Sequence, residues 1–215
     1  MNIGFDLWGT LIKGSPSFQL AKQLLLKEYF PQIPVGKFIL AQERVKRELD
    51  RLTEQSGYQS TSGVRIRLLL KYIGLDFNNN DIHAKMELFF KDYQEIFKIF
   101  KPLLWSKETE DYYNQICDIV SNVYIVSNTL FIKKDALEYF IEDYFSYEGF
   151  YTSDSQNFAK PYRMIFNSSL DYFIGDNPKT DGVYAKSVGA KFIQINSNNK
   201  TIKDAYEIIL NATNK

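Results

Sequence analysis

After Pro102 the sequence alternates short apolar runs with helical segments, and this alternation restricts the possible folds more than any other feature. The apolar, β-rich runs lie at residues 123–126, 149–152, 172–174 and 192–195. Helical patterns separate them at residues 131–145, 161–168 and 178–188, the last followed by Gly189. Strands that alternate with helices form a parallel sheet with helices on both faces. The sequence therefore predicts a doubly wound α/β fold.

A further strand is expected at the start of the chain, far from the others. Residues 3–7 form a short apolar run that ends at the turn residue Gly9. Between residues 15 and 101, apolar residues recur at three- and four-residue spacing, with breaks that indicate about four helices. We therefore expect residues 1–13 and 102–215 to form a Rossmann-like core and residues 14–101 to form an inserted α-helical cap.

Composition and charge exclude several classes of protein. The 26 lysines and arginines balance 26 aspartates and glutamates, so no nucleic acid is expected as a partner. The single cysteine, Cys117, excludes an intramolecular disulfide framework. Neither a signal peptide nor a membrane span is recognisable, so no membrane partner is expected. These features predict a cytoplasmic protein that is a monomer or a homodimer.

Polar side chains follow the predicted strands at the ends where open parallel sheets bind their ligands. These residues are Asp6, Ser127, Asn128 and Asp176, and Asp181 comes five residues after the last of them. Lys160 lies at the head of a predicted helix. Carboxylate oxygens are the ligands that Mg²⁺ prefers, whereas lysine and hydroxyl groups neutralise and orient phosphoryl oxygens. The set predicts a site for a divalent cation and a phosphate.

Four segments that contain these residues resemble the four motifs of the haloacid dehalogenase-like (HAD) hydrolase superfamily, in the same order. They read FDLWGTL at residues 5–11, VSNT at 126–129, AKP at 159–161 continuing to Ile165 and Phe166, and GDNPKTD at 175–181 continuing to Gly189 and Ala190. One such segment alone is weak evidence. Together the four cover essentially the whole predicted core.

The resemblance implies a Rossmann-like core with a helical cap inserted after the first motif, and Mg²⁺ as the cofactor. In that superfamily the first aspartate attacks phosphorus, and water hydrolyses the resulting aspartyl-phosphate, so Asp6 would be the nucleophile. The implied metal ligands are Asp6, the backbone carbonyl of Trp8, Asp176 and Asp181. The implied phosphate-binding residues are Ser127, Asn128 and Lys160, and Lys160 is also implied as catalytic because it holds the nucleophile.

Trp8 departs from the superfamily pattern. Phosphatases usually place a second aspartate there to protonate the leaving group, and a positioned acid contributes about 10²- to 10⁴-fold. Dehalogenases of the superfamily have an aromatic residue instead, since a halide leaves without protonation. The paired Asp176 and Asp181 favour the phosphatase, because a dehalogenase needs no metal-type site. Trp8 and Thr10 are expected to face the substrate or the cap.

Simpler structural roles remain open for several residues. Asp6 could cap the turn before Gly9, and Trp8 could fill space under the cap. His83, the only histidine, is expected on the surface, so a serine–histidine or cysteine–histidine hydrolase scheme lacks its base. Cys117 is expected to be a small core residue.

Basic residues gather in the predicted cap. They are Arg44, Lys46, Arg47, Arg51, Arg65 and Arg67. Most are expected to be solvated, and one or two could reach an anionic substrate.

Three functions remain open on the sequence alone. The preferred one is a Mg²⁺-dependent phosphatase that acts on a small phosphorylated metabolite, slowly because the general acid is missing. The second is a hydrolytic dehalogenase, which needs no metal. The third is a phosphate-binding or regulatory module that keeps the metal site and has lost turnover.

Overall fold

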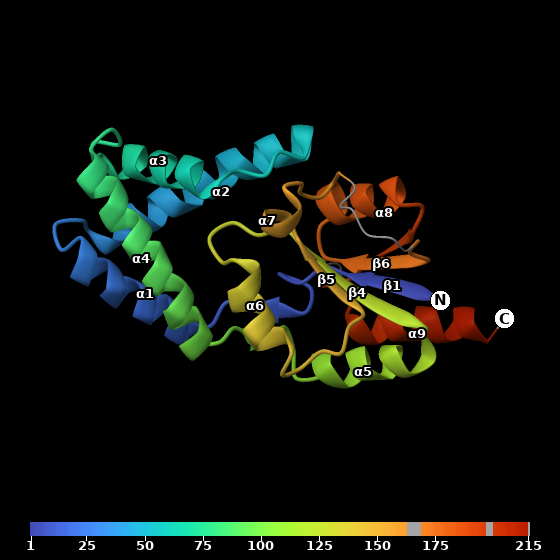
Figure 1. The fold of residues 1–215 in the computed structure, drawn as a ribbon. Helices are drawn as coiled ribbons and strands as arrows, with labels where there is room; N and C mark the ends of the chain where they lie inside the picture. The colour runs from blue at the N-terminus through green and yellow to red at the C-terminus, as the bar shows by residue number, and fades with distance from the viewer. Residues whose placement is uncertain (163–168, 197–199, 215) are drawn as a thin grey trace.

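A five-stranded parallel sheet forms the centre of the protein (Figure 1). The computed structural model describes residues 1–162, 169–196 and 200–214. The strands, in their order across the sheet, are β5 (Gly149–Thr152), β4 (Asn122–Ser127), β1 (Asn2–Phe5), β6 (Tyr172–Gly175) and β7 (Lys191–Gln194). All four strand pairs are parallel. The predicted α/β sheet is confirmed.

The strand order brings the carboxyl ends of three strands together. β1 lies in the middle, where Phe5 pairs with Ile125 of β4 on one side and with Ile174 of β6 on the other. The chain builds β4 and β5 outward on the first side and then returns to place β6 and β7 on the second. A crevice opens at such a reversal point, and open α/β sheets bind their ligands there.

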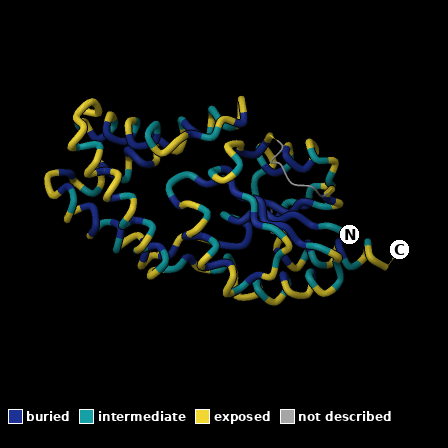
Figure 2. Tube along the Cα trace, viewed as in Figure 1, coloured by how far each residue is buried: buried dark blue, intermediate teal, exposed yellow. Residues whose placement is uncertain are grey.

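Helices cover both faces of the sheet because its strands are apolar on both sides. In β4, Val123 and Ile125 belong to one buried cluster, whereas Tyr124 and Val126 belong to another on the opposite face. Two helices that contact each other, α5 (Thr109–Ile119) and α9 (Ile202–Thr213), lie on one face, and α8 (Val183–Ser187) lies on the other (Figure 1). Figure 2 shows the strands as the most continuously buried part of the chain.

Four helices follow β1, as the sequence predicts, and we call them the helical insertion (Figure 1). They are α1 (Pro16–Tyr29), α2 (Val35–Ser56), α3 (Ser62–Ile73) and α4 (Asn80–Ile99). Ser15, Thr61 and Asn79 cap the starts of α1, α3 and α4 with their side-chain oxygens. The ends of α2 and α3 fall at glycines in the left-handed conformation. Local turn chemistry therefore sets these helix boundaries.

A short antiparallel pair of strands connects the helical insertion to the sheet region. β2 (Ile12–Lys13) leads into α1, and β3 (Leu103–Leu104) leads back from α4. Ile12 pairs with Leu104, and Lys13 pairs with Leu103. Both crossings of the chain therefore lie side by side. The sequence pattern does not predict this pair, because two-residue strands carry no periodicity.

Two predicted helices differ in their bounds. The helix expected at residues 131–145 is α6 (Lys134–Ile141), because Lys133 and Phe131 are held in a loop by Gln94. The helix expected at 178–188 is a π-helical turn, η1 (Pro178–Gly182), followed by α8. Of the helix expected at 161–168, residues 161 and 162 form a turn and the rest lies outside the described residues.

Two remaining findings concern a short helix and membrane insertion. A further short helix, α7 (Ser153–Gln156), follows β5. Within the described part of the chain, no helix is both long and apolar enough to cross a membrane.

Candidate active site

The turn after β1 fixes Asp6 at the carboxyl edge of the sheet. The Asp6 N–H donates to the Ile174 carbonyl at 2.8 Å, which continues the ladder between β1 and β6. Its side chain is nearly buried, and the Thr10 hydroxyl donates to Asp6 Oδ2 at 3.0 Å. Gly9 has a φ of +83°, which favours glycine, and its N–H donates to the Ile12 carbonyl. The turn therefore holds the Asp6 carboxylate in one orientation.

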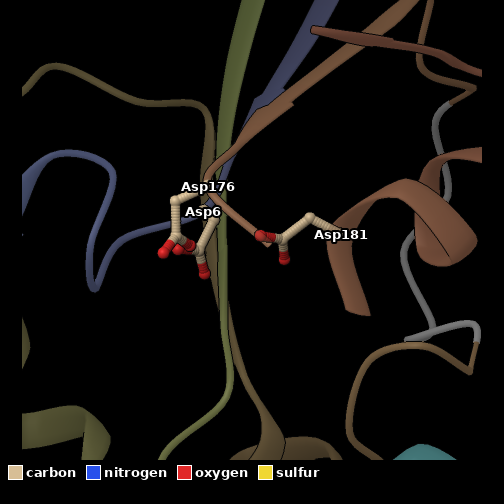
Figure 3. A group of neighbouring side chains, drawn as sticks. All are labelled: Asp6, Asp176 and Asp181. Atoms are coloured by element: carbon tan, nitrogen blue, oxygen red, sulfur yellow. The ribbon is translucent and has the colours of Figure 1, made fainter. Parts of the chain in front are cut away.

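Asp176 and Asp181 come from the adjacent end of β6. Figure 3 shows Asp176 beside Asp6, with Asp181 pointing toward them from η1. One carboxylate oxygen from each of the three aspartates lies within 4.8 Å of the others. A Cβ at Gly9 would lie 2.6 Å from Asp176 Oδ2, so a side chain there would collide with the cluster. We call Asp6, Asp176 and Asp181 the acidic cluster.

Lys160 lies against the acidic cluster and is 1% exposed. Its ammonium donates to Asp6 Oδ1, and to Asp181 Oδ1 at 2.7 Å. The backbone of Lys160 is held in turn by the amide of Asn128, whose Oδ1 accepts from the Lys160 N–H at 2.8 Å and whose Nδ2 donates to the Lys160 carbonyl at 3.0 Å. The loop after β4 therefore positions the lysine.

Burial and charge act in opposite directions on these groups. Burial raises the pKa of Asp6 to about 7, with Lys160 lowering it and Asp181 raising it further. The pKa of Asp176 is also raised, first by burial and then by Asp181. Burial lowers the pKa of Lys160, but the two carboxylates that it contacts outweigh this and raise it. One cation thus lies beside three carboxylates. When all three are ionised, the net charge of the group is negative, so a further cation would be attracted.

The chemistry of the donors fits Mg²⁺. The ion takes oxygen ligands and is commonly held by one or two carboxylates together with water and phosphate oxygens. The acidic cluster supplies carboxylates from two strand ends, and the donor set lacks the thiolate and imidazole groups that favour softer metals. The residues present therefore fit the cofactor that the sequence predicts.

A cavity of about 440 Å³ lies between the acidic cluster and the helical insertion. Its aromatic wall consists of Trp8, Phe18, Tyr93 and Phe131, and its polar wall includes Lys46, Asp50, Thr53 and Glu54 of α2. The Trp8 ring lies 6.2 Å from the ring of Phe97 in α4, measured between centroids. Trp8 therefore lies between the acidic cluster and the helical insertion, and its contact with a substrate stays a prediction.

The structure brings together most of the residues singled out in the sequence. The cavity is lined by Asp6, Trp8, Asn128, Lys160, Asp176 and Asp181. Ser127 ends β4 fully buried, and its hydroxyl donates to the Asn128 carbonyl at 3.4 Å. Thr10 is 1% exposed and holds Asp6. Substrate contact by Thr10 and phosphate binding by Ser127 and Asn128 stay predictions.

Two residues with simpler expected roles lie away from this cavity. His83 is half-buried on α4, where its Nδ1 lies 3.5 Å from Glu87. Cys117 is partly buried on α5 and packs against the main core cluster. Neither residue lies among the described residues that line the cavity.

The sequence does not reveal a second contact between the helical insertion and the site. The Gly57 carbonyl, just after α2, accepts from the Ala159 N–H at 3.2 Å, directly beside Lys160. Gln59 Nε2 donates to the Thr129 carbonyl at 3.2 Å. Turn residues at 56–63 mark a break between helices, but they give no sign of what the turn contacts. The turn between α2 and α3 therefore contacts the loops that contain the second and third predicted motifs.

Comparison with solved structures identifies the fold. The Bacillus subtilis protein YfnB, assigned to the HAD hydrolases and bound to magnesium, aligns with a TM-score of 0.64 at 18% identity, covering 97% of this chain and 98% of its own. A 2-haloacid dehalogenase from Pseudomonas syringae aligns with a TM-score of 0.61 at 13% identity, covering 98% of each chain. A predicted phosphoglycolate phosphatase from Haemophilus somnus gives 0.60 at 18% identity, covering 98% of this chain and 96% of its own.

The chain therefore has the fold of the HAD-like hydrolases over nearly its whole length, as its four motifs predict. These structures include a predicted phosphatase and a dehalogenase, so the fold does not choose between the two reactions. No family model and no curated protein matches the sequence. The choice of function depends on the residues of the site.

Proposed function

We propose that this protein is a Mg²⁺-dependent phosphatase that forms an aspartyl-phosphate on Asp6. The observation that carries the proposal is the acidic cluster, with carboxylate oxygens within 4.8 Å of one another and the Lys160 ammonium against two of its members. A substrate phosphate needs both neutralising charge and an anionic nucleophile held close to phosphorus. The acidic cluster and Lys160 supply both at the floor of one cavity.

In the proposed reaction, an Asp6 carboxylate oxygen attacks phosphorus, and the bond from phosphorus to the leaving oxygen breaks. Water then attacks the phosphorus of the aspartyl-phosphate, which releases inorganic phosphate and restores the carboxylate. Dividing the displacement in this way replaces one difficult step with two easier ones. Mg²⁺, held by Asp6, Asp176, Asp181 and the Trp8 carbonyl, would stabilise charge on the phosphoryl oxygens.

Lys160 and the end of β4 would orient the transferred group. The Lys160 ammonium is held by the carboxylates of Asp6 and Asp181. Among the described residues it is the one cationic group that lines the cavity beside Asp6. Ser127 and Asn128 would offer hydrogen bonds to phosphoryl oxygens. Because Ser127 ends a buried strand and Lys160 is held by two carboxylates, these groups need little rearrangement to reach the transition state.

The absence of an acid at Trp8 shapes the expected substrates. Indole cannot protonate a leaving oxygen, so the protein should favour small metabolites with good leaving groups, such as acyl or aryl phosphates. We propose that the helical insertion, residues 14–101, acts as the cap that covers such a substrate, because α2 forms the wall opposite the acidic cluster. A cavity of about 440 Å³ suits a small metabolite.

Turnover of an aryl phosphate tests the proposal. The protein should release phosphate with Mg²⁺ and lose this activity with a chelator. Asp6→Asn should abolish turnover, whereas the matched change Asp111→Asn, at an exposed aspartate on α5, should leave it unchanged. Equal activity in the Asp6→Asn protein would rule the proposal out.

Trp8 favours a dehalogenase as the second candidate, since an aromatic residue replaces the acid. A dehalogenase would release halide from a haloacid equally well with and without a chelator. If Trp8→Asp raises aryl phosphate turnover by about 10²-fold and Trp8→Asn does not, the phosphatase is supported, because only the carboxyl can act as an acid. A stable phosphate on Asp6 without turnover would support the regulatory module instead.

A further inference from the structure

A second cavity, of about 300 Å³, lies beside the first between α3, α4 and the loop after β4. We call it the side cavity. Leu130 and Phe131 line both cavities, but the acidic cluster and Lys160 line only the first. The side cavity is therefore a separate space with one shared wall, and nothing in the proposed phosphatase chemistry uses it.

Arg65 is a buried cation in the wall of the side cavity. The residue is 8% exposed, and its guanidinium donates to the carbonyls of Thr61 and Ser60 at 3.3 and 2.9 Å. Among the described residues no carboxylate lies within 4.0 Å of it. Asp154 acts on it from further away, but that carboxylate already accepts from Thr129 Oγ1 at 2.7 Å. The charge of Arg65 is therefore buried without a close counterion.

Such an arrangement is costly unless an anion completes it. Moving a charge out of water is unfavourable, and carbonyl dipoles compensate it less fully than a carboxylate or phosphate does. A guanidinium is also the side chain best suited to grip a planar anionic group with two parallel hydrogen bonds. The first turn of α3, where Arg65 lies, contains no acidic residue that could serve instead.

The other charges around the side cavity strengthen its positive character. Lys91 and Lys133 line it, and within the described ranges neither forms an ion pair within 4.0 Å. Of the two glutamates that line it, Glu95 is paired with Lys98 at 3.0 Å. Glu87 is the other, and its side chain is 62% exposed. Three cations without an ion pair among the described residues therefore face one well-solvated carboxylate, Glu87, whose nearest charged or titratable partner is His83 at 3.5 Å.

One wall of the side cavity is apolar and is held by ring stacking and hydrogen bonds. The rings of Phe90 and Phe131 stack in parallel, with centroids 5.2 Å apart and an interplanar angle of 1°. Gln94 holds this wall in place, because its Nε2 donates to the Phe131 carbonyl at 2.7 Å and its Oε1 accepts from the Lys133 N–H at 2.9 Å. The wall is therefore formed before any ligand arrives.

We propose that the side cavity binds a small organic anion with an apolar or aromatic body. The anionic group would meet Arg65 and Lys133, and the body would lie against Phe90 and Phe131. Binding needs neither Mg²⁺ nor Asp6, so this inference stands apart from the proposed phosphatase. An occupant would touch the loop that follows Ser127 and Asn128, which gives it a direct contact with the shared wall of the first cavity.

Calorimetric titration of the full chain with benzenesulfonate, in the presence of a chelator, tests this inference. Benzenesulfonate carries both an aromatic body and an anion, but it offers no phosphate to the acidic cluster. We expect one saturable site. Benzenesulfonamide, which lacks the charge, and inorganic sulfate, which lacks the ring, should each bind at least about tenfold more weakly.

Two variants and a matched control locate the site. Arg65→Met keeps the length of the side chain and should weaken binding about tenfold or more, whereas Arg67→Met, at an exposed arginine on the same helix, should change it less than about twofold. Lys133→Gln alters an exposed residue, so it provides a folded test if Arg65→Met does not fold.

Binding that falls in Lys133→Gln and in folded Arg65→Met, and that persists in Asp6→Asn, would support the proposal. No saturable binding at millimolar benzenesulfonate would overturn it. Equal binding of all three probes, or binding unchanged in both Arg65→Met and Lys133→Gln, would overturn it as well.

Discussion

The acidic cluster and Lys160 form the floor of the first cavity, and α2 forms the wall opposite them. Both the floor and the wall contain ion pairs, yet the exposure of these pairs to solvent differs. On the floor, Asp6, Lys160 and Asp181 are 6%, 1% and 1% exposed. On the wall, the Lys46 ammonium lies 2.5 Å from Asp50 one helical turn away, but the two side chains are 65% and 48% exposed. The same kind of ion pair is buried at one side of the cavity and solvated at the other.

This difference separates two tasks. A buried pair interacts strongly and loses much when one partner is removed, whereas an exposed pair contributes roughly 0–1 kcal/mol. The floor is thus fixed in geometry and charge, as the proposed phosphatase reaction requires. The wall can exchange its partners for water or substrate at little cost. We therefore expect changes on the floor to affect metal binding and catalysis, and changes on the wall to affect substrate preference.

Removing the charge of Lys160 should have the largest effect. Lys160→Met leaves two buried carboxylates without their cation, so we expect aryl phosphate turnover to fall by about 10³-fold and the metal-free protein to lose about 3 kcal/mol of unfolding free energy. Urea unfolding and steady-state kinetics measure the two losses. Lys22→Met is the control, because Lys22 on α1 is also a buried lysine, 8% exposed, but burial alone, with no carboxylate, lowers its pKa. A stable, active Lys160→Met protein would contradict the comparison.

Filling the space beside Asp176 should have the next largest effect. In Gly9→Ala the new Cβ would lie 2.6 Å from Asp176 Oδ2, so the acidic cluster must shift, and we expect Mg²⁺ affinity to fall about 10- to 100-fold. Gly189→Ala is matched, since Gly189 has a similar positive φ of +79° and open space around its Cβ position. Both variants share the stability cost of a side chain at positive φ, but only Gly9→Ala adds a collision and should lose Mg²⁺ affinity in a calorimetric titration.

The pH dependence should also distinguish floor from wall. The pKa of Asp6 is 3.8 in the unfolded reference and about 7 in the folded protein, so between these values the folded metal-free protein holds a proton that the unfolded chain has released. Its unfolding free energy should therefore fall as the pH rises from about 4 through about 7. Mg²⁺ affinity should rise over the same range, because the ligand must lose its proton.

Urea unfolding at several pH values, with and without Mg²⁺, measures both trends. Asp6→Asn should reduce this pH dependence and leave the part due to Asp176, whereas Asp50→Asn on the wall should retain it in full. A pH-independent Mg²⁺ affinity would show that the Asp6 carboxyl does not bind the ion.

Changing the wall should have the smallest effect. Lys46→Gln removes an exposed cation that lines the cavity, so we expect KM for an anionic substrate to rise a few-fold, roughly 1 kcal/mol or less, while kcat and Mg²⁺ affinity stay unchanged. The exposed Lys107→Gln, outside the cavity, serves as its control. A large loss of kcat in Lys46→Gln would mean that the wall takes part in chemistry.

Much of the floor can be predicted from the sequence because local chemistry determines it. Strands β1, β4, β5, β6 and β7 follow from short apolar runs, and a parallel sheet places the polar residue after each strand at one edge. Asp6, Asp176 and Asp181 thus lie close together at this edge, and their roles as metal ligands stay predictions. Glycine at residue 9 is required by both a positive φ and the closeness of Asp176.

The walls could not be predicted, because they depend on how distant segments dock. Periodicity identifies α2 as amphipathic, but nothing local indicates that Lys46 faces the acidic cluster. The motifs mark Asn128 as a phosphate ligand, whereas its amide is engaged by the backbone of Lys160, 32 residues away. The burial of Arg65 could not be predicted from its sequence position, because it depends on how the loop after β4 packs against α3 and α4.

The β2–β3 pair places the two ends of the helical insertion side by side. Lys13 and Leu103 are direct partners across two antiparallel strands, which is the spacing that a two-residue turn bridges. A shortened gene that joins these two positions through such a turn would delete all four helices without moving either strand. Because the helical insertion and the sheet share one buried apolar cluster, such a deletion would keep the β2–β3 pair but expose apolar residues on the sheet side.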